Sequence, residues 1–116
     1  MNIYNTMHRR VERFVPIKKG KVGMYVCGPT VNGPGHLGHA STYIAFDVIR
    51  RAFEYLGYEV KLVVNLTDIH DDMIKESNKR DITLFELADI YIDRFMKDLS
   101  ALNIKPAHAY PRVTEN

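Results

Sequence analysis

Residues 24–39 read Met-Tyr-Val-Cys-Gly-Pro-Thr-Val-Asn-Gly-Pro-Gly-His-Leu-Gly-His, and the strongest structural signal in the chain lies here. The apolar start indicates a buried strand, the glycines and prolines indicate a turn, and the end indicates the first turn of a helix. Three glycines and two histidines surround the expected helix start: Gly33, Gly35, Gly38, His36 and His39. Free backbone N–H groups and the helix dipole favour an anion at such a place. We therefore expect this stretch to bind the phosphates of a nucleotide, with both histidines touching them.

The composition describes one modest globular domain. The chain has 116 residues, of which 46% are hydrophobic and 26% charged, as in ordinary globular proteins. A formal net charge of +2 permits an RNA or nucleotide partner without requiring one. Cys27 is the one cysteine, which excludes an intrachain disulfide and favours a reducing, cytoplasmic location. No apolar run approaches the ~18 residues that a membrane span needs, so we expect no membrane association.

Three successive segments carry the patterns of a buried strand, a helix and a second strand: residues 22–27, 36–56 and 58–66. This order is a βαβ unit, so we predict an α/β fold with a parallel sheet. Ligands of such sheets bind beyond the carboxyl ends of the strands. Cys27 and Gly28 lie at the carboxyl end of the first strand, and residues 65–68, Asn-Leu-Thr-Asp, lie at that of the second. We therefore expect these two stretches, with Thr67 in the second, to share one site.

The first predicted helix has apolar residues at helical spacing, which predict its buried face: Ile44, Ala45, Val48, Ile49, Ala52 and Phe53. Arg50 and Arg51 lie late in this helix, where positive charge suits the helix dipole. Gly57 follows it and is a good residue for ending a helix.

The remaining segments give weaker signals. Residues 84–102 predict a further helix, which begins with a capping box of Thr83 and Glu86. Residues 1–21 are interrupted by a proline and a glycine, so we expect extended or irregular structure there. We interpret their basic side chains as a solvated face in preference to an RNA contact. Residues 107–116 indicate a connection or the start of another element.

His36 and His39 are the sharpest chemical feature. Positions i and i+3 of a helix lie on one face, and metal binding with Cys27 as the nearest further ligand is one interpretation. We favour phosphate binding, because the flanking glycines remove packing partners and histidine N–H groups stabilise developing negative charge. Gly38 lets the base or ribose approach the backbone closely.

Cys27 and the acidic residues after the second strand have several interpretations. From the residues alone, Cys27 is interpreted first as a small buried apolar side chain, ahead of a nucleophile or a metal ligand. Asp68 suits a turn or a cap, and its position at the sheet edge also permits a substrate contact. Asp71 and Asp72 suit a helix start in preference to Mg²⁺ binding.

The chain resembles the amino-terminal part of the catalytic domain of the cysteinyl-tRNA synthetases, which are class I aminoacyl-tRNA synthetases. Seven motifs carry the resemblance: Tyr-Val-Cys-Gly-Pro-Thr-Val (25–31), His-Leu-Gly-His (36–39), Ala-Phe-Asp-Val-Ile-Arg-Arg (45–51), Tyr-Leu-Gly-Tyr-Glu-Val (55–60), Asn-Leu-Thr-Asp-Ile (65–69), Ala-Leu-Asn-Ile (101–104) and Pro-Arg-Val-Thr-Glu-Asn (111–116). The resemblance implies a Rossmann-type (HUP-like) parallel sheet with helices on its faces. Residues 1–116 would form the amino-terminal half of this nucleotide-binding domain.

The resemblance also implies a reaction and its site residues. Such enzymes activate L-cysteine with ATP and Mg²⁺ to cysteinyl-adenylate and transfer it to tRNA-Cys. The implied ATP-binding residues lie in the signature region 29–39: Pro29, Thr30, Gly35, His36, Gly38 and His39, with His36 and His39 catalytic. Cys27, Gly28 and Thr67 would bind the cysteine substrate. Cys27 would also be a ligand of Zn²⁺, which reverses the interpretation of this residue as an inert apolar side chain.

The sequence departs from the family pattern in two places. Residues 32–35 are Asn-Gly-Pro-Gly, where the family usually has an aromatic and an acidic residue. Residues 68–72 are Asp-Ile-His-Asp-Asp, where the family usually has Asp-x-Asp-Asp-Lys.

Other parts of such enzymes are not in this chain, including the further zinc ligands, and we expect them in the remainder of the synthetase chain. We therefore expect the 116-residue chain to lack full activity alone. Two alternatives remain. One is a cysteine:amino-sugar ligase of the mycothiol type, and the other is a non-catalytic, synthetase-like binding or assembly module.

Overall fold

A computed structural model describes residues 1–115, so Asn116, the last residue of the motif at 111–116, lies outside the described residues. Its elements are, in chain order, β1 (Asn2–Asn5), β2 (Arg10–Arg13), β3 (Lys21–Val26), α1 (Leu37–Tyr55), β4 (Glu59–Val64), α2 (Asp71–Arg80), α3 (Leu84–Ala101) and the short 3₁₀ helix η1 (Val113–Glu115). Within the described chain, no helix is both long and apolar enough to cross a membrane.

The βαβ unit predicted from the sequence is confirmed as a parallel strand pair joined by α1. β3 and β4 pair in parallel from Lys21 opposite Glu59 to Val26 opposite Val64. Residues 107–116 were predicted to be a connection or the start of another element, and residues 107–112 run beside β4, where Ala109 forms a parallel bridge with Val63. The chain therefore has an α/β fold, with a third extended segment continuing the order β3, β4.

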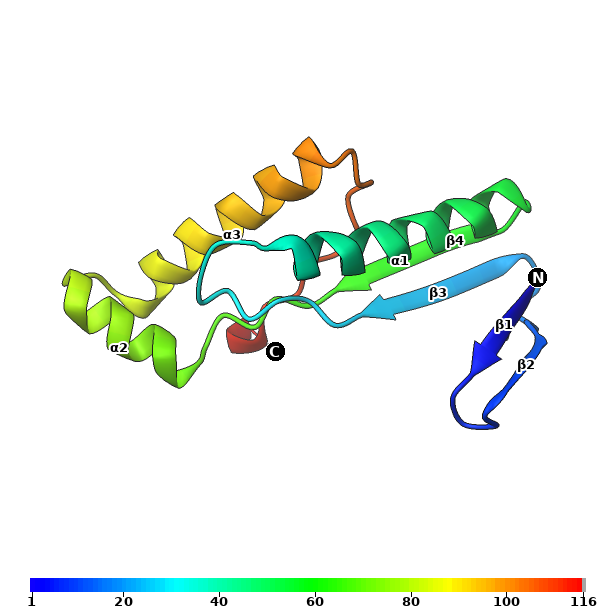
Figure 1. Cartoon of the computed structure of the whole chain (residues 1–116), viewed down its shortest axis with the longest axis horizontal. Helices are drawn as coiled ribbons and strands as arrows, with labels where there is room; N and C mark the ends of the chain where they lie inside the picture. Colours follow the sequence, from blue (N-terminus) through cyan, green and yellow to red (C-terminus); the bar gives the residue numbers. More distant parts are fainter. Residues whose placement is uncertain (116) are drawn as a thin grey trace.

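Residues 1–21, expected to be extended or irregular, include the two extended strands β1 and β2. These strands form an antiparallel hairpin with Tyr4 opposite Val11, and Arg9 has a positive φ of 52° in the turn between them. β-branched and aromatic residues favour this pairing. Figure 1 shows the hairpin projecting from the amino end of β3, away from the helices.

The main core lies between the sheet and the helices α1 and α3. It contains mostly aliphatic and aromatic side chains: Val26, Val31, Tyr43, Leu62, Val64, Leu66, Met73, Leu87, Ala88, Tyr91, Phe95 and Leu99. The start of α3 is the predicted capping box, since Thr83 Oγ1 accepts from the N–H of Glu86 at 3.2 Å and the Glu86 carboxylate accepts from the N–H of Thr83 at 2.8 Å.

The predicted buried face of α1 is largely wrong. Ile44, Val48 and Ile49 are exposed, whereas Asp47 and Arg50 are each only 7% exposed. Charged side chains are rarely buried unless they are paired. Phe53 of the predicted face is buried, and Tyr43 is buried with it. The inward face of α1 is therefore fixed by polar partners of Asp47 and Arg50 as well as by apolar packing.

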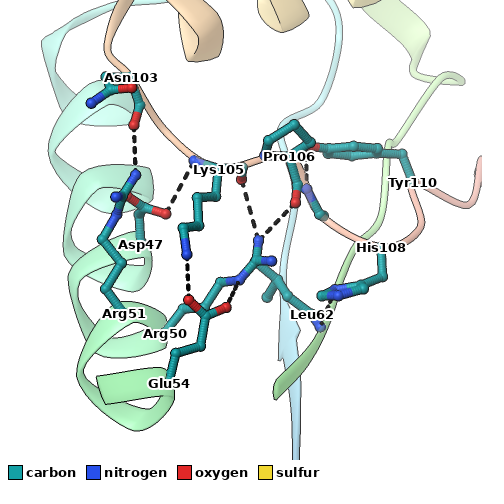
Figure 2. Close-up of polar contacts among 11 residues, drawn as sticks. Asp47, Arg50, Arg51, Glu54, Leu62, Asn103, Lys105, Pro106, His108 and Tyr110 are labelled. Carbon is teal, nitrogen blue, oxygen red and sulfur yellow. Dashed lines mark hydrogen bonds and ion pairs between the residues drawn. The ribbon is translucent and has the colours of Figure 1, made fainter. Parts of the chain in front are cut away.

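Arg50 makes the central polar contact of α1 (Figure 2). Its Nη1 donates to the carbonyl oxygen of Pro106 at 2.7 Å, and its Nε donates to Glu54 Oε1 at 2.9 Å. Lys105 Nζ binds the other oxygen of Glu54, and hydrogen bonds from Lys105 and Arg50 hold the pKa of Glu54 below its ordinary value. Arg50 thus fastens α1 to the segment that follows α3.

Arg51 and Asp47 extend the same network. Arg51 Nε donates to Asp47 Oδ2 at 2.7 Å, and Arg51 Nη2 donates to the carbonyl oxygen of Asn103 at 2.8 Å. The backbone N–H of Lys105 donates to Asp47 Oδ1 at 3.1 Å. The prediction that these arginines serve the helix dipole is wrong, because the last turn of α1 contains no basic residue and both guanidinium groups have local acceptors.

Glycine and asparagine end the two long helices. Gly57 has a φ of 87° after α1, as the sequence predicted, and Asn103 has a φ of 55° after α3. In α3 the N–H of Ile104 donates to the carbonyl of Leu99 and the N–H of Asn103 to that of Ser100. This is the Schellman pattern, which satisfies carbonyls left free at a helix end.

Arg50→Ala tests the network. The substitution leaves the Pro106 carbonyl and the Glu54 carboxylate without their buried donor, so we expect the free energy of unfolding to fall by about 2–4 kcal/mol, measured by urea denaturation. The control is Lys97→Ala, which breaks an exposed ion pair with Asp93 and should cost less than about 1 kcal/mol. Equal effects of the two substitutions would contradict the importance of the buried network.

Candidate functional site

The carboxyl ends of β3 and β4 are joined by backbone hydrogen bonds beyond the strands themselves. The N–H of Val31 donates to the carbonyl of Thr67 at 3.0 Å, and the N–H of Thr67 donates to the carbonyl of Pro29 at 3.1 Å. These bonds place Thr30 opposite Thr67 in a parallel bridge. The prediction that the ends of the two strands converge is therefore confirmed.

Gly28 lies at the closest approach between the two strand ends. A Cβ atom on Gly28 would lie 1.4 Å from the carbonyl oxygen of Asn65, so no other residue fits. The Gly28 N–H donates to Asn65 Oδ1 at 2.8 Å, and the Tyr25 hydroxyl donates to the same oxygen at 3.0 Å. Asn65 Nδ2 lies 3.5 Å from Thr67 Oγ1. Asn65 therefore connects two predicted cysteine-binding residues, Gly28 and Thr67.

The sequence places Asn65 in the stretch 65–68 at this edge, but it predicts no contact of its own for Asn65. The feature that could have identified Asn65 is its position directly after β4, because polar side chains that follow the strands of a parallel sheet meet at one edge.

Cys27 follows β3 and is exposed, so its interpretation as a buried apolar residue is wrong. Its carbonyl oxygen accepts from the hydroxyl of Tyr43 at 3.3 Å. Burial raises the pKa of Tyr43 to about 12, with a further contribution from Cys27, so this hydroxyl stays protonated as a donor. Among residues 1–115, no group of three or more His, Cys, Asp or Glu side chains could hold a metal ion. The described residues therefore do not fit a complete zinc site, and Cys27 offers at most one ligand.

His36 and His39 form the cap of α1. His36 is the N-cap residue, and its Nδ1 accepts from the N–H of Gly38 at 3.1 Å. His39 Nδ1 accepts from the N–H of His36 at 3.4 Å. The two rings stack with their centroids 3.8 Å apart and an angle of 19° between their planes. Two histidines thus perform the reciprocal capping that Ser or Thr with Glu usually performs.

This cap sets the tautomer of each neutral ring. A histidine nitrogen that accepts an N–H bond carries no proton, so each neutral ring has its proton on Nε2. Each imidazole therefore offers one N–H donor in addition to its bond to the backbone. Partial burial lowers the pKa of His39, and the neighbouring His36 lowers it further.

A cavity of about 410 Å³ lies beside this cap, between the start of α1 and the end of α3. His36, His39 and Gly35 line one side, and Phe95 and Asp98 of α3 line the other. A Cβ atom on Gly35 would lie 2.8 Å from Asp98 Oδ2, so this loop lies close to the exposed carboxylate of Asp98 on α3. Figure 1 shows the loop between β3 and α1 reaching beyond the end of the sheet before it returns to α1.

The acidic residues after β4 have structural partners. Asp68 is 1% exposed, and its carboxylate accepts from the N–H of Thr114 at 3.1 Å and from the Thr114 hydroxyl at 2.6 Å. Asp68 therefore anchors the end of the described chain. Asp71 and Asp72 lie in the first turn of α2, as the dipole interpretation predicts.

The chain matches a family model described as "tRNA synthetases class I (C) catalytic domain" over residues 13–116. It belongs to this family. The chain is similar to proteins named cysteine–tRNA ligase, with 55% identity over 98% of this chain to the one from Lactobacillus gasseri. It has 53% identity over its whole length to the one from Thermococcus kodakarensis. The chain spans about a quarter of the length of these curated relatives, 24% in both cases.

One departure of this class I synthetase chain from the expected pattern has a structural explanation. His70, where an acidic residue is usual, is the N-cap of α2, and its Nδ1 accepts from the N–H of Asp72 at 3.3 Å. A carboxylate oxygen at this position would accept the same bond. Histidine therefore preserves the cap while removing one negative charge.

The two-histidine cap predicts a dependence of stability on pH. The pKa of His39 is lower in the folded chain than its ordinary value of 6.5, so the unfolded chain takes up the proton first as the pH falls. The contribution of His39 to the free energy of unfolding is constant above about pH 6.5. It becomes destabilising as the pH falls through this value toward the pKa of the folded chain. In His39→Asn, the side-chain Oδ1 replaces Nδ1 as the acceptor but does not titrate. We therefore expect urea denaturation to show that the free energy of unfolding falls less between about pH 7.5 and 5.5 in this variant than in the wild-type chain. Superimposable profiles of the two proteins would contradict this role of His39.

Proposed function

We propose that the chain forms the amino-terminal half of the Rossmann-type catalytic domain of a cysteine–tRNA ligase. In this proposal, the enzyme activates L-cysteine with ATP to cysteinyl-adenylate and transfers it to tRNA-Cys. The observation that carries the proposal is the cap of α1, in which His36 and His39 each bind the backbone through Nδ1 and keep an Nε2–H donor. The relatives named cysteine–tRNA ligase support the choice of substrates.

The histidines act on ATP as neutral donors. Their Nε2–H groups bind phosphate oxygens at the positive end of α1, where the helix dipole also favours negative charge. A donor held in place before the reaction stabilises the charge that develops on the α-phosphate without further reorganisation. Pro29, Thr30, Gly35 and Gly38 shape the loop around the nucleotide, and Mg²⁺ accompanies ATP as part of the substrate.

Cys27, Gly28 and Thr67 hold the cysteine substrate at the other end of the site. Gly28 and Thr67 are joined through Asn65, so this end is rigid before the substrate arrives. We propose that the exposed thiol of Cys27 supplies one zinc ligand and that the other ligands come from the remainder of the synthetase chain. Zinc prefers sulfur ligands and would distinguish cysteine from serine. The reducing cytoplasm, where Cys27 remains a free thiol, is the proposed location.

A chimaera tests this function. Residues 1–116 replace the corresponding segment of the Lactobacillus gasseri cysteine–tRNA ligase, which is 55% identical. We expect the chimaera to charge tRNA-Cys with cysteine and to bind zinc, as measured by aminoacylation and elemental analysis. We expect Cys27→Ser to lose zinc. A folded chimaera that transfers cysteine to an amino sugar but not to tRNA-Cys would support the alternative ligase, and one without ATP-dependent activation of cysteine would support a non-catalytic module.

Substitutions at the cap separate its two roles within the chimaera. His36→Asn retains an acceptor for the Gly38 N–H but removes the Nε2–H donor, so we expect cysteine activation to fall about 10- to 100-fold with little loss of stability. The matched control is His70→Asn at the cap of α2, which should leave activation unchanged. Normal activation by a folded His36→Asn chimaera would contradict the donor role.

A further inference from the structure

Positive charge is concentrated at the start of the chain. Residues 1–21 contain six lysine and arginine residues and a single acidic residue, whereas residues 22–116 contain ten basic and thirteen acidic residues. The sequence alone favours a solvated face for this segment. The structure instead favours a binding surface, because it places these charges on a hairpin and a turn that project from the body of the molecule (Figure 1).

Most of these cations are available to a partner. All six are exposed: Arg9, Arg10, Arg13, Lys18, Lys19 and Lys21. Arg10 pairs with Glu12, and Lys21 pairs with Glu59. Across residues 1–115, the ion pairs of the structure do not include the other four. Unpaired exposed cations at this density attract a polyanion.

The register of the hairpin adds an aromatic side chain to this surface. Arg13 lies opposite Asn2, and Tyr4 lies opposite Val11, so Tyr4 and Arg13 are diagonal neighbours on the same face. The Tyr4 side chain is 61% exposed. Both residues line a hollow of about 590 Å³ in the hairpin. An exposed tyrosine beside a free guanidinium group provides a stacking platform for a nucleic-acid base.

A second hollow continues this surface. It has a volume of about 320 Å³, contains Lys18 and Lys21, and shares Phe14 and Val15 with the first hollow. Cations are therefore placed along two adjoining hollows, with the ring of Tyr4 in one of them and that of Phe14 in both. This is the arrangement by which proteins follow the backbone of a single nucleic-acid strand while its bases stack.

We propose that the β1–β2 hairpin and the turn that follows it bind an unpaired strand of RNA. The bases stack on Tyr4, and the phosphates lie along Arg9, Arg13 and Lys18. This surface lies at the amino end of β3, opposite the sheet edge that carries Cys27. RNA binding by this surface therefore does not depend on the proposed function of that edge. A protein partner is less suitable, because basic residues interrupt the exposed apolar residues of this segment and carry nearly all of its charge.

Binding of a fluorescent oligouridylate to the 116-residue chain tests the proposal. Fluorescence anisotropy over a series of salt concentrations gives the affinity and its salt dependence. One variant reverses three charges of the surface: Arg9→Glu, Arg13→Glu and Lys18→Glu. The control has the same change in net charge on α2 and α3: Lys75→Glu, Lys79→Glu and Arg94→Glu.

The two charge variants should differ strongly. Because each phosphate contact contributes about 0.7 to the slope of log affinity against log salt for a single strand, we expect the surface variant to lower this slope by about 2. Its affinity should fall at least ~100-fold, and that of the control should fall less than ~10-fold. Tyr4→Leu should lower the affinity about 10-fold with an unchanged slope, because it removes stacking alone. Circular dichroism confirms that each variant is folded.

Three results would overturn the proposal. One is equal loss of affinity in the two charge variants, which would show a non-specific effect of net charge. Another is equal affinity for double-stranded RNA, which would leave Tyr4 without a role. The third is the absence of RNA binding by the wild-type chain, including the case in which the hairpin instead mediates association between protein chains.

Discussion

The close contact between Gly28 and Asn65 is the constraint on which the site depends. The backbone of Gly28 approaches the Asn65 carbonyl so closely that a Cβ atom would lie 1.4 Å away, and the Asn65 side chain accepts the Gly28 N–H at 2.8 Å. These contacts hold the ends of β3 and β4 together after the strands have ended. The backbone pairing of Pro29 with Thr67 continues from there, and it fixes where the loop to α1 begins.

The start of α1 combines two tasks in the same side chains. His36 and His39 satisfy backbone N–H groups that a helix start leaves free, and this bond determines which nitrogen of each ring keeps its proton. A cationic ring would lose its acceptor and place positive charge at the positive end of the helix dipole. The cap and the proposed ATP contact therefore require the same neutral, Nε2-protonated histidines. Tyr43 joins this helix to β3 through the carbonyl of Cys27.

The sequence predicted the elements whose signals are local. β3, α1, β4 and α3 lie within one or two residues of their expected bounds, because apolar periodicity and capping residues act over a few positions. The inward face of α1 was not predictable from local sequence. Arg50 is buried there because it donates to the carbonyl oxygen of Pro106, which lies far along the chain. Asn65 and the exposure of Cys27 likewise depend on contacts between segments distant in sequence.

Nitrogen-15 NMR of the imidazole rings tests the neutral histidine cap most directly. Long-range nitrogen–proton correlation spectra identify the protonated nitrogen of His36 and His39 at neutral pH. We expect a proton on Nε2 and none on Nδ1 in both rings, and a shift of the Nε2 signals when ATP is added. A proton on Nδ1, or an imidazolium ring at neutral pH, would contradict it.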